Sequence, residues 1–236
     1  MKQLYFTLMV VFLFGSCTFS QVYFPPKEFV YISDSSYLYD KFYPIGWSKD
    51  GKFAYITEPA DEATGFYFWD LCIISPDSGK MIYLKENTIE DEKFDRTIDG
   101  LFKLKKDSIE LILKTFKIEQ QTFSNFNDTL IGVNTPNRYL LGKKACMLRS
   151  PLDFMDVITS YDIMLFSGDE KSRTVFSKDI PNSYDIEMDV CGSFSSKDKK
   201  FNAIVYYLIQ RGYEGPPHVA RIKLLGISGE FIDNLK

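Results

Sequence analysis

The acidic residues that could carry chemistry gather in two segments rich in glycine and proline. Glu58, Asp61 and Glu62 share the first segment, and Glu214 follows Tyr213 in the second. Two facing carboxylates can hydrolyse a glycosidic bond, and clustered carboxylates can bind a hard cation such as Ca²⁺. Acidic loop residues are more often simply solvated, and no D-x-D-x-D-G calcium loop is present. We predict these five residues as ligand-facing loop residues.

The sequence gives little support to other common catalytic chemistries. Serine and cysteine nucleophiles need a base, and His218 is the only histidine. Four cysteines without a C-x-x-C pair do not supply the usual zinc ligands. Neither a P-loop nor a G-x-G-x-x-G string occurs. We therefore predict no catalytic residue, no metal and no cofactor, and we leave open whether the protein is an enzyme, with a binding role favoured.

The overall charge limits the possible partners. The formal net charge is −4, and no stripe of Arg and Lys offsets it. Such a surface repels phosphate backbones, so nucleic acid is not expected as a partner. The same sign disfavours electrostatic docking on anionic lipid, so any membrane attachment should be covalent.

The N-terminal 16 residues are typical of a signal peptide. Lys2 precedes 11 largely apolar residues, Leu4 to Phe14, a length too short for a membrane-spanning helix, which needs about 20. Gly15 and Ser16 then stand directly before Cys17.

This junction resembles the lipobox of bacterial lipoproteins, although Phe14 occupies a position where that family prefers Leu. The resemblance implies a diacylglyceryl, palmitate-bearing anchor on Cys17 and attachment to a bacterial membrane, on the periplasmic face or at the cell surface. Soluble export to the periplasm or beyond, with cleavage after Ser20, is the main alternative; a retained anchor is another.

The rest of the chain is expected to be rich in strands. Aromatic residues make up 16% of the sequence and favour half-buried pleated surfaces. Strands are predicted at 29–32, 53–56, 66–74 and 81–84, with a tight turn at Asp50-Gly51. A further hairpin is predicted from Tyr161-Phe166 and Thr174-Phe176, and one short strand at 130–133.

The string W-S-K-D-G-K-F-A-Y, at 47–55, resembles the W-S-P-D-G-K core of TolB-type propeller repeats, with Lys49 in place of the family's Pro. Residues 196–201 repeat the turn at an offset of 148, and 229–232 match 79–82 at an offset of 150. Together with the G-Y-E-G-P loop at 212–216, the turn also resembles a family of predicted secreted bacterial proteins of unknown function. Both resemblances imply blade-like units and no particular activity.

A helical insertion is predicted near 88–118. The string Thr88-Ile89-Glu90-Asp91 resembles a capping box, and apolar residues follow it at helical spacing, with a second cap at Asp107 or Ser108. A hairpin across Lys106-Asp107 is the alternative.

The predicted fold is mainly β with this insertion, built from blade-like antiparallel hairpin units that form an incomplete propeller or a sandwich-like sheet. We divide the chain into a signal peptide (1–16), a tether (17–27) and one β-rich domain (28–236), with repeat-like units near 43–84 and 190–232.

Two groups of residues leave alternatives open. The cysteines Cys72, Cys146 and Cys191 allow at most one disulfide, and the apolar neighbours of Cys72 and Cys191 favour buried thiols. The aromatic residues either offer stacking surfaces or fill the core; the set is Tyr43, Trp47, Phe66, Tyr67 and Tyr213.

The predicted function is that of an exported envelope lipoprotein serving as a binding or structural module, with an envelope protein or a glycan as its partner. The alternative is a secreted hydrolase or a cation-binding protein that uses the acidic loops.

Overall fold

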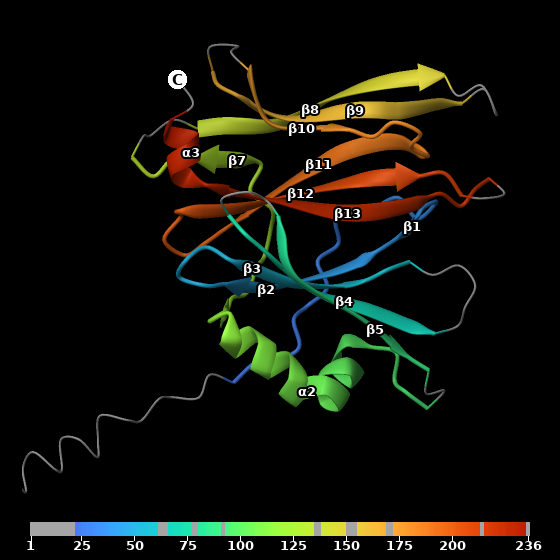
Figure 1. Ribbon diagram of the computed structural model, residues 1–236, viewed down its shortest axis with the longest axis vertical. Coiled ribbons are helices and arrows are strands. Elements are labelled where there is room, and N and C mark those ends of the chain that lie inside the picture. Colours follow the sequence, from blue (N-terminus) through green and yellow to red (C-terminus); the bar gives the residue numbers. More distant parts are fainter. Residues whose placement is uncertain are drawn as a thin grey trace, which may run out of the picture.

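The computed structural model describes residues 22–60, 66–76, 80–90, 93–134, 138–149, 155–168, 172–212 and 215–234. Within these ranges, three β-sheets and one long helix are stacked as layers (Figure 1). We name the sheets A, B and C. In the order of the stack, sheet C lies on sheet A, sheet A on sheet B, and sheet B on the helix α2. The mainly β fold with a helical insertion is therefore confirmed.

Sheet B contains four consecutive strands, β2 to β5, as an antiparallel meander, to which β6 is added. It has the strand order β5-β4-β3-β2-β6. Its strands are β2 (Lys41–Trp47), β3 (Phe53–Glu58), β4 (Tyr67–Ile74), β5 (Met81–Ile89) and the short β6 (Glu119–Gln120). In β4, Trp69 and Leu71 pack toward α2 while Cys72 and Ile74 pack toward sheet A. This alternation buries both faces of the strand.

Helix α2 (Ile98–Thr115) covers the outer face of sheet B. Its buried residues are Leu101, Phe102, Ile109 and Leu113, which recur at helical spacing. The helix begins at Thr97, whose hydroxyl accepts a hydrogen bond of 3.1 Å from Gly100 N. The predicted helix is therefore confirmed, and the alternative hairpin across Lys106-Asp107 is wrong. The helix does not start at the predicted residue.

The capping box expected at Thr88 does not form because this residue is extended. Thr88 and Ile89 pair with Phe68 and Tyr67 of β4, so their backbone groups already belong to the sheet. The second cap at Asp107 or Ser108 is also wrong, since both residues lie inside the single helix α2.

Sheet C is a second meander, with the strand order β10-β9-β8-β7. Its strands are β7 (Thr129–Ile131), β8 (Arg138–Arg149), β9 (Asp156–Phe166) and β10 (Ser172–Asp179). The predicted hairpin of β9 and β10 is confirmed, with the two strands antiparallel. An isolated bridge between Asn127 and Ser193 joins the edge of this sheet to sheet A.

Sheet A contains the C-terminal strands and lies in the middle of the stack. It has the order β1-β13-β12-β11, from β1 (Leu38–Tyr39), β11 (Asp185–Ser195), β12 (Phe201–Gln210) and β13 (Val219–Ser228). Strand β1 runs parallel to β13 and covers only Val219 and Ala220 of it. After Asp40 the chain continues into β2, so it passes directly from sheet A into sheet B.

The two Ser-Lys-Asp turns share one hydrogen-bond arrangement. Ser48 Oγ donates to Asp50 Oδ1, and Ser196 Oγ donates to Asp198 Oδ1 at 2.7 Å. The first turn precedes β3 and the second precedes β12. In each turn the third residue after the serine has a positive φ: Gly51 in the first and Lys199 in the second. The second turn is one residue longer, because Ser48 N donates to Lys52 O whereas Ser196 N donates to Phe201 O.

Two other predictions are wrong. Residues 229–232 do not repeat the strand of 81–82 but belong to the short helix α3 (Gly229–Asp233), which Ser228 caps by accepting from Phe231 N. Residues 29–32 form no strand; a single hydrogen bond from Phe29 N to Phe42 O holds this segment against β2. No helix among the described residues combines the length and the apolar character required to cross a membrane.

Candidate ligand-binding cleft

Most of the predicted site residues fall outside the part of the chain that the structure describes. These are Cys17, Asp61, Glu62, Tyr213 and Glu214, and the signal peptide lies there too. Their assignments therefore stay predictions. Glu58 is the predicted site residue whose position is described.

Glu58 ends strand β3 and points into the layer between sheet B and α2, with 6% of its surface exposed. Its Oε2 accepts from Lys41 Nζ at 3.0 Å, and its Oε1 accepts from the Tyr67 hydroxyl. Burial, together with this carboxylate, raises the pKa of Tyr67 and of Tyr43. Both oxygens of Glu58 are engaged, so its described role is structural.

The stems of the two predicted loops meet at Arg221 of β13. Its Nη1 donates to Ala60 O at 3.2 Å, beside the first loop, and its Nε donates to Gln210 Oε1 at 3.4 Å, beside the second. Nη1 also donates to Asp40 Oδ1 at 2.8 Å, and Ala60 N donates to the same oxygen. The described ends of both loops are therefore held at one edge of the fold.

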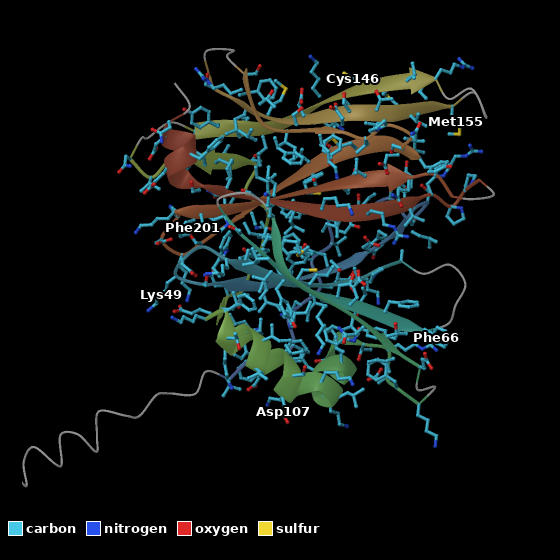
Figure 2. All side chains as sticks on the ribbon, in the orientation of Figure 1. Lys49, Phe66, Asp107, Cys146, Met155 and Phe201 are labelled. Carbon is cyan, nitrogen blue, oxygen red and sulfur yellow. The ribbon has the colours of Figure 1, made fainter. Side chains whose placement is uncertain are left out.

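The aromatic residues mostly fill the core. Tyr43, Trp47 and Tyr67 are 3%, 2% and 6% exposed, so they offer no stacking surface. Phe66, which Figure 2 labels at the start of β4, is 44% exposed. The predicted alternative of a binding surface is therefore wrong for the three buried rings.

His218 and the cysteines show no nucleophile–base pair in the described residues. His218 Nδ1 accepts from Gly212 N at 3.3 Å, and its ring stacks on Tyr37. Cys72 is buried, Cys191 is half-buried and Cys146 is exposed, and all three thiols are free. Burial raises the pKa of Cys72 and of Cys191 to about 12, which leaves both protonated and unreactive at neutral pH.

A cleft of about 460 Å³ opens where sheets A, B and C approach one another. We call it the interlayer cleft. Sheet B contributes Asp70, Cys72, Met81 and Leu84, sheet A contributes Tyr206, Ile222, Lys223 and Leu224, and sheet C contributes Phe176 and Lys178. Its size and its mixture of apolar walls with a few polar groups are typical of small-molecule sites. Strand β1 pairs with only the first two residues of β13, and the cleft lining begins just beyond them, at Ile222.

Two aspartates line the interlayer cleft, and they differ in how their charge is compensated. Asp40 pairs with Arg221 and accepts further hydrogen bonds from Ala60 N and Ile222 N. Asp70 has no ion pair with any basic side chain of the described chain. The carboxylate available to a ligand is therefore that of Asp70.

Asp70 stands in an environment that disfavours its charge. Its cross-strand neighbour in β5 is Glu86, a like charge directly opposite, which is destabilising in a sheet. Burial first, then the negative charges of Glu86 and Asp40, raises the pKa of Asp70 to about 6. A cationic group bound here would favour the charged form of Asp70 and offset the negative charges of Glu86 and Asp40, so the position is suited to a positively charged ligand group.

The opposite walls of the interlayer cleft carry positive charge. Lys223 of β13 and Lys178 of β10 line it, and both are exposed residues. Lys223 lies near enough to Cys72 to oppose the rise in the pKa of that thiol. The cleft thus presents a carboxylate from sheet B and ammonium groups from sheets A and C.

Asp70 is absent from the predicted site residues, although the sequence contains a signal for it. Asp70 is the only charged residue in the strand segment F-Y-F-W-D-L-C-I-I, at 66–74. A charge in the middle of a buried strand needs a partner or a function. The cleft itself has no such signal, because its walls come from strands far apart in the sequence.

Among the residues that the structure describes, no group of three or more His, Cys, Asp or Glu side chains is placed to hold a metal ion. Comparison of the chain with protein-family models, with curated proteins and with solved structures gives no match. The arrangement of residues in the interlayer cleft is therefore the basis for the function proposed below.

The first testable consequence concerns stability. Asp70→Asn should raise the free energy of unfolding at pH 8 by about 1–2 kcal/mol, a pKa displacement of about two units discounted for partial exposure. The gain should persist above pH 6, shrink as the pH falls from 6 to 4 because the folded state then protonates Asp70, and vanish below pH 4. Urea denaturation across this pH range measures it. The exposed Asp179→Asn is the control, and a pH-independent effect of Asp70→Asn would contradict the assignment.

Proposed function

We propose that the protein is an exported, lipid-anchored binding module whose interlayer cleft takes a small zwitterionic ligand such as an amino acid or a short peptide. The observation that carries the proposal is the uncompensated Asp70 in a cleft of about 460 Å³. A partly buried carboxylate without an ion pair lowers the stability of the fold, and residues that lower stability are typical of functional sites.

The distribution of charge favours a ligand with both signs. An ammonium group can pair with Asp70 between Glu86 and the wall of sheet A, while a carboxylate can reach Lys178 or Lys223. Between these ends, Met81, Leu84 and Phe176 provide apolar contacts. A purely anionic ligand would face Asp70 and Asp40, and a purely cationic one would face the two lysines.

The lipid anchor is proposed from the resemblance at Cys17, and the first described residues bear on its geometry. The Tyr23 hydroxyl donates to Ile118 O at 2.6 Å, and Gln120 makes two hydrogen bonds with the backbone of Phe24, at 2.8 and 2.9 Å. Tyr23 is 3% exposed. Six residue steps separate Cys17 from Tyr23, a reach of at most about 20 Å. An anchor on Cys17 would therefore hold the domain close to the bilayer.

Binding of the dipeptide L-alanyl-L-alanine tests the proposed ligand class. We expect the dipeptide to bind with saturable heat in isothermal titration, and Asp70→Asn to weaken binding by about tenfold or more, because a hydrogen-bonded ion pair is lost. The N-acetylated dipeptide, which lacks the ammonium group, should bind wild type as weakly as the parent dipeptide binds Asp70→Asn. Lys223→Gln combined with Lys178→Gln should weaken binding of the dipeptide. The same double variant should bind the C-terminal amide of the dipeptide, which lacks the carboxylate, as wild type does.

The matched control is Asp179→Asn, an exposed carboxylate on β10 outside the cleft lining. It should bind like wild type. Equal binding of the dipeptide and its N-acetyl derivative, or wild-type binding by Asp70→Asn, would contradict the proposal. No binding of any of these compounds would reject the zwitterionic ligand class.

A further inference from the structure

A second, smaller pocket lies beside the turn that connects β11 and β12. It measures about 180 Å³, and its lining includes Asn127, Thr129, Ser195, Lys197, Lys199 and Asn202. We call it the Asn202 pocket. Phe201, labelled in Figure 2, marks this turn. The Asn202 pocket shares no lining residue with the interlayer cleft.

Asn202 is 2% exposed and has an amide nitrogen without a hydrogen-bond partner. The orientation of the amide follows from its neighbours. Asn127 Nδ2 donates to Ser195 Oγ at 3.2 Å, and Ser195 Oγ then donates to Asn202 Oδ1 at 2.7 Å. This chain fixes Oδ1 as the acceptor and leaves both protons of Nδ2 for another group. A buried donor without a partner costs about 1–3 kcal/mol.

The fold does not require a polar pair at this position. In the first turn the residues that face each other at the same place in the hairpin register are Trp47 and Phe53, a buried aromatic pair. In the second turn they are Ser195 and Asn202. A hairpin of the same kind thus forms elsewhere in the chain without Ser195 and Asn202, although Trp47 Nε1 is there also a buried donor without a partner. What distinguishes Asn202 is that it lines a pocket.

The charge at the mouth of the Asn202 pocket is positive. Lys197 and Lys199 line it and are exposed, and no carboxylate is among its lining residues. The adjacent Asp198 is engaged, because it accepts from Ser196 Oγ and from Lys200 N. Lys199 has a φ of 60°, a conformation that favours glycine and that Gly51 adopts in the first turn. A lysine thus occupies a backbone position that favours glycine, as Lys117 does after α2.

We propose that the Asn202 pocket binds a small tetrahedral oxyanion of the phosphate class. Asn202 Nδ2 and the Thr129 hydroxyl donate hydrogen bonds to it, and the ammonium groups of Lys197 and Lys199 neutralise its charge. The inference goes beyond the binding module proposed above and stands independently of it, since it uses neither Asp70 nor Cys17.

Titration with sodium phosphate tests the site on the ¹⁵N-labelled protein. At constant ionic strength, the side-chain amide resonances of Asn202 should shift with saturation, and sulfate should compete. Acetate, which is planar and carries one charge, should bind about tenfold more weakly, a difference that corresponds to about 1.4 kcal/mol.

Three variants separate binding from folding. Asn202→Asp keeps the side-chain size but replaces the donor with a carboxylate, and it should abolish saturable shifts of the Thr129 and Lys199 amides. Lys199→Gly suits the positive φ, so the melting temperature should stay that of wild type. The same variant should bind phosphate about tenfold more weakly, because one charged contact is lost. Lys49→Ala, at the first turn, is the control and should bind phosphate as wild type does.

Shifts that rise linearly with phosphate, or equal saturation by acetate and phosphate, would overturn the site. Wild-type binding by both Asn202→Asp and Lys199→Gly would overturn it as well. Asp70→Asn should bind phosphate normally, so the failure of the interlayer cleft as a ligand site and the failure of the Asn202 pocket are distinguishable.

Discussion

Phe194→Ala should lower the free energy of unfolding by about 4 kcal/mol, which is typical of a fully buried phenylalanine. Phe194 lies in β11 and is 1% exposed. Its ring contacts five others, from sheet B, from the segment before β7 and from the N-terminal segment: Phe29, Phe42, Phe53, Phe123 and Phe126. Removing it therefore leaves a cavity where three parts of the chain meet, and aromatic contacts are lost in addition to buried area.

Urea denaturation followed by circular dichroism measures this change. Phe231→Ala is the matched control, because Phe231 lies in α3 and is 42% exposed; it should cost less than about 1 kcal/mol, the usual range for a surface substitution. A cost for Phe194→Ala as small as that of the control would show that the junction of sheets A and B does not depend on this cluster.

The parts of the fold that the sequence predicts well are those with local signals. The Asp50-Gly51 turn and the strand predicted at 53–56 follow from turn chemistry and from alternating apolar residues, and they occur as the β2–β3 turn and as β3. The hairpin predicted from 161–166 and 174–176 follows from the same signals and occurs as β9 and β10. Each of these elements is decided by residues within about ten positions, so no knowledge of the rest of the chain is required.

Several errors fall where distant partners decide the structure. Thr88 begins a string that resembles a capping box, yet it pairs with Phe68 in β4. Residues 229–232 resemble a strand by their match to 79–82, but Ser228 caps them as helix α3. Strands β8 and β11 are not among the predicted strands. Most residues of β8 are exposed, so this strand lacks a regular alternation of buried and exposed side chains. Tertiary pairing overrides local propensity at Thr88, whereas at 229–232 the overlooked signal is local, the N-cap Ser228.

The candidate sites also divide into a part that local sequence signals predict and a part that depends on distant residues. Asp70 was detectable in principle as the one charge within a buried strand, whereas its cross-strand neighbour Glu86 depends on the β4–β5 register. Asn202 gives no signal in the sequence, because its unpartnered amide follows from a contact chain that begins at Asn127, 75 positions earlier. Predicting such a site requires the arrangement of sheets A and C, which local patterns do not contain.

Cys17→Ser should move nearly all of the protein from the membrane fraction to the soluble fraction. The proposed anchor consists of acyl chains on the Cys17 thiol, and serine offers no thiol to the lipid transferase. Two or more chains give stable attachment at about 0.8 kcal/mol per buried CH₂ group. The expected loss of membrane attachment is therefore several orders of magnitude in partition coefficient.

Detergent phase partitioning and incorporation of labelled palmitate measure the two consequences of Cys17→Ser together. Cys146→Ser is the matched control, because Cys146 is a free, exposed thiol on β8, at the end of the stack opposite Asp107 of α2 (Figure 2). It should partition and incorporate label as wild type does. If Cys17→Ser partitions unchanged, the lipid anchor is refuted; if wild type is soluble and begins after Ser20, soluble export replaces it. A partial loss of label in each variant would instead place acylation on both cysteines.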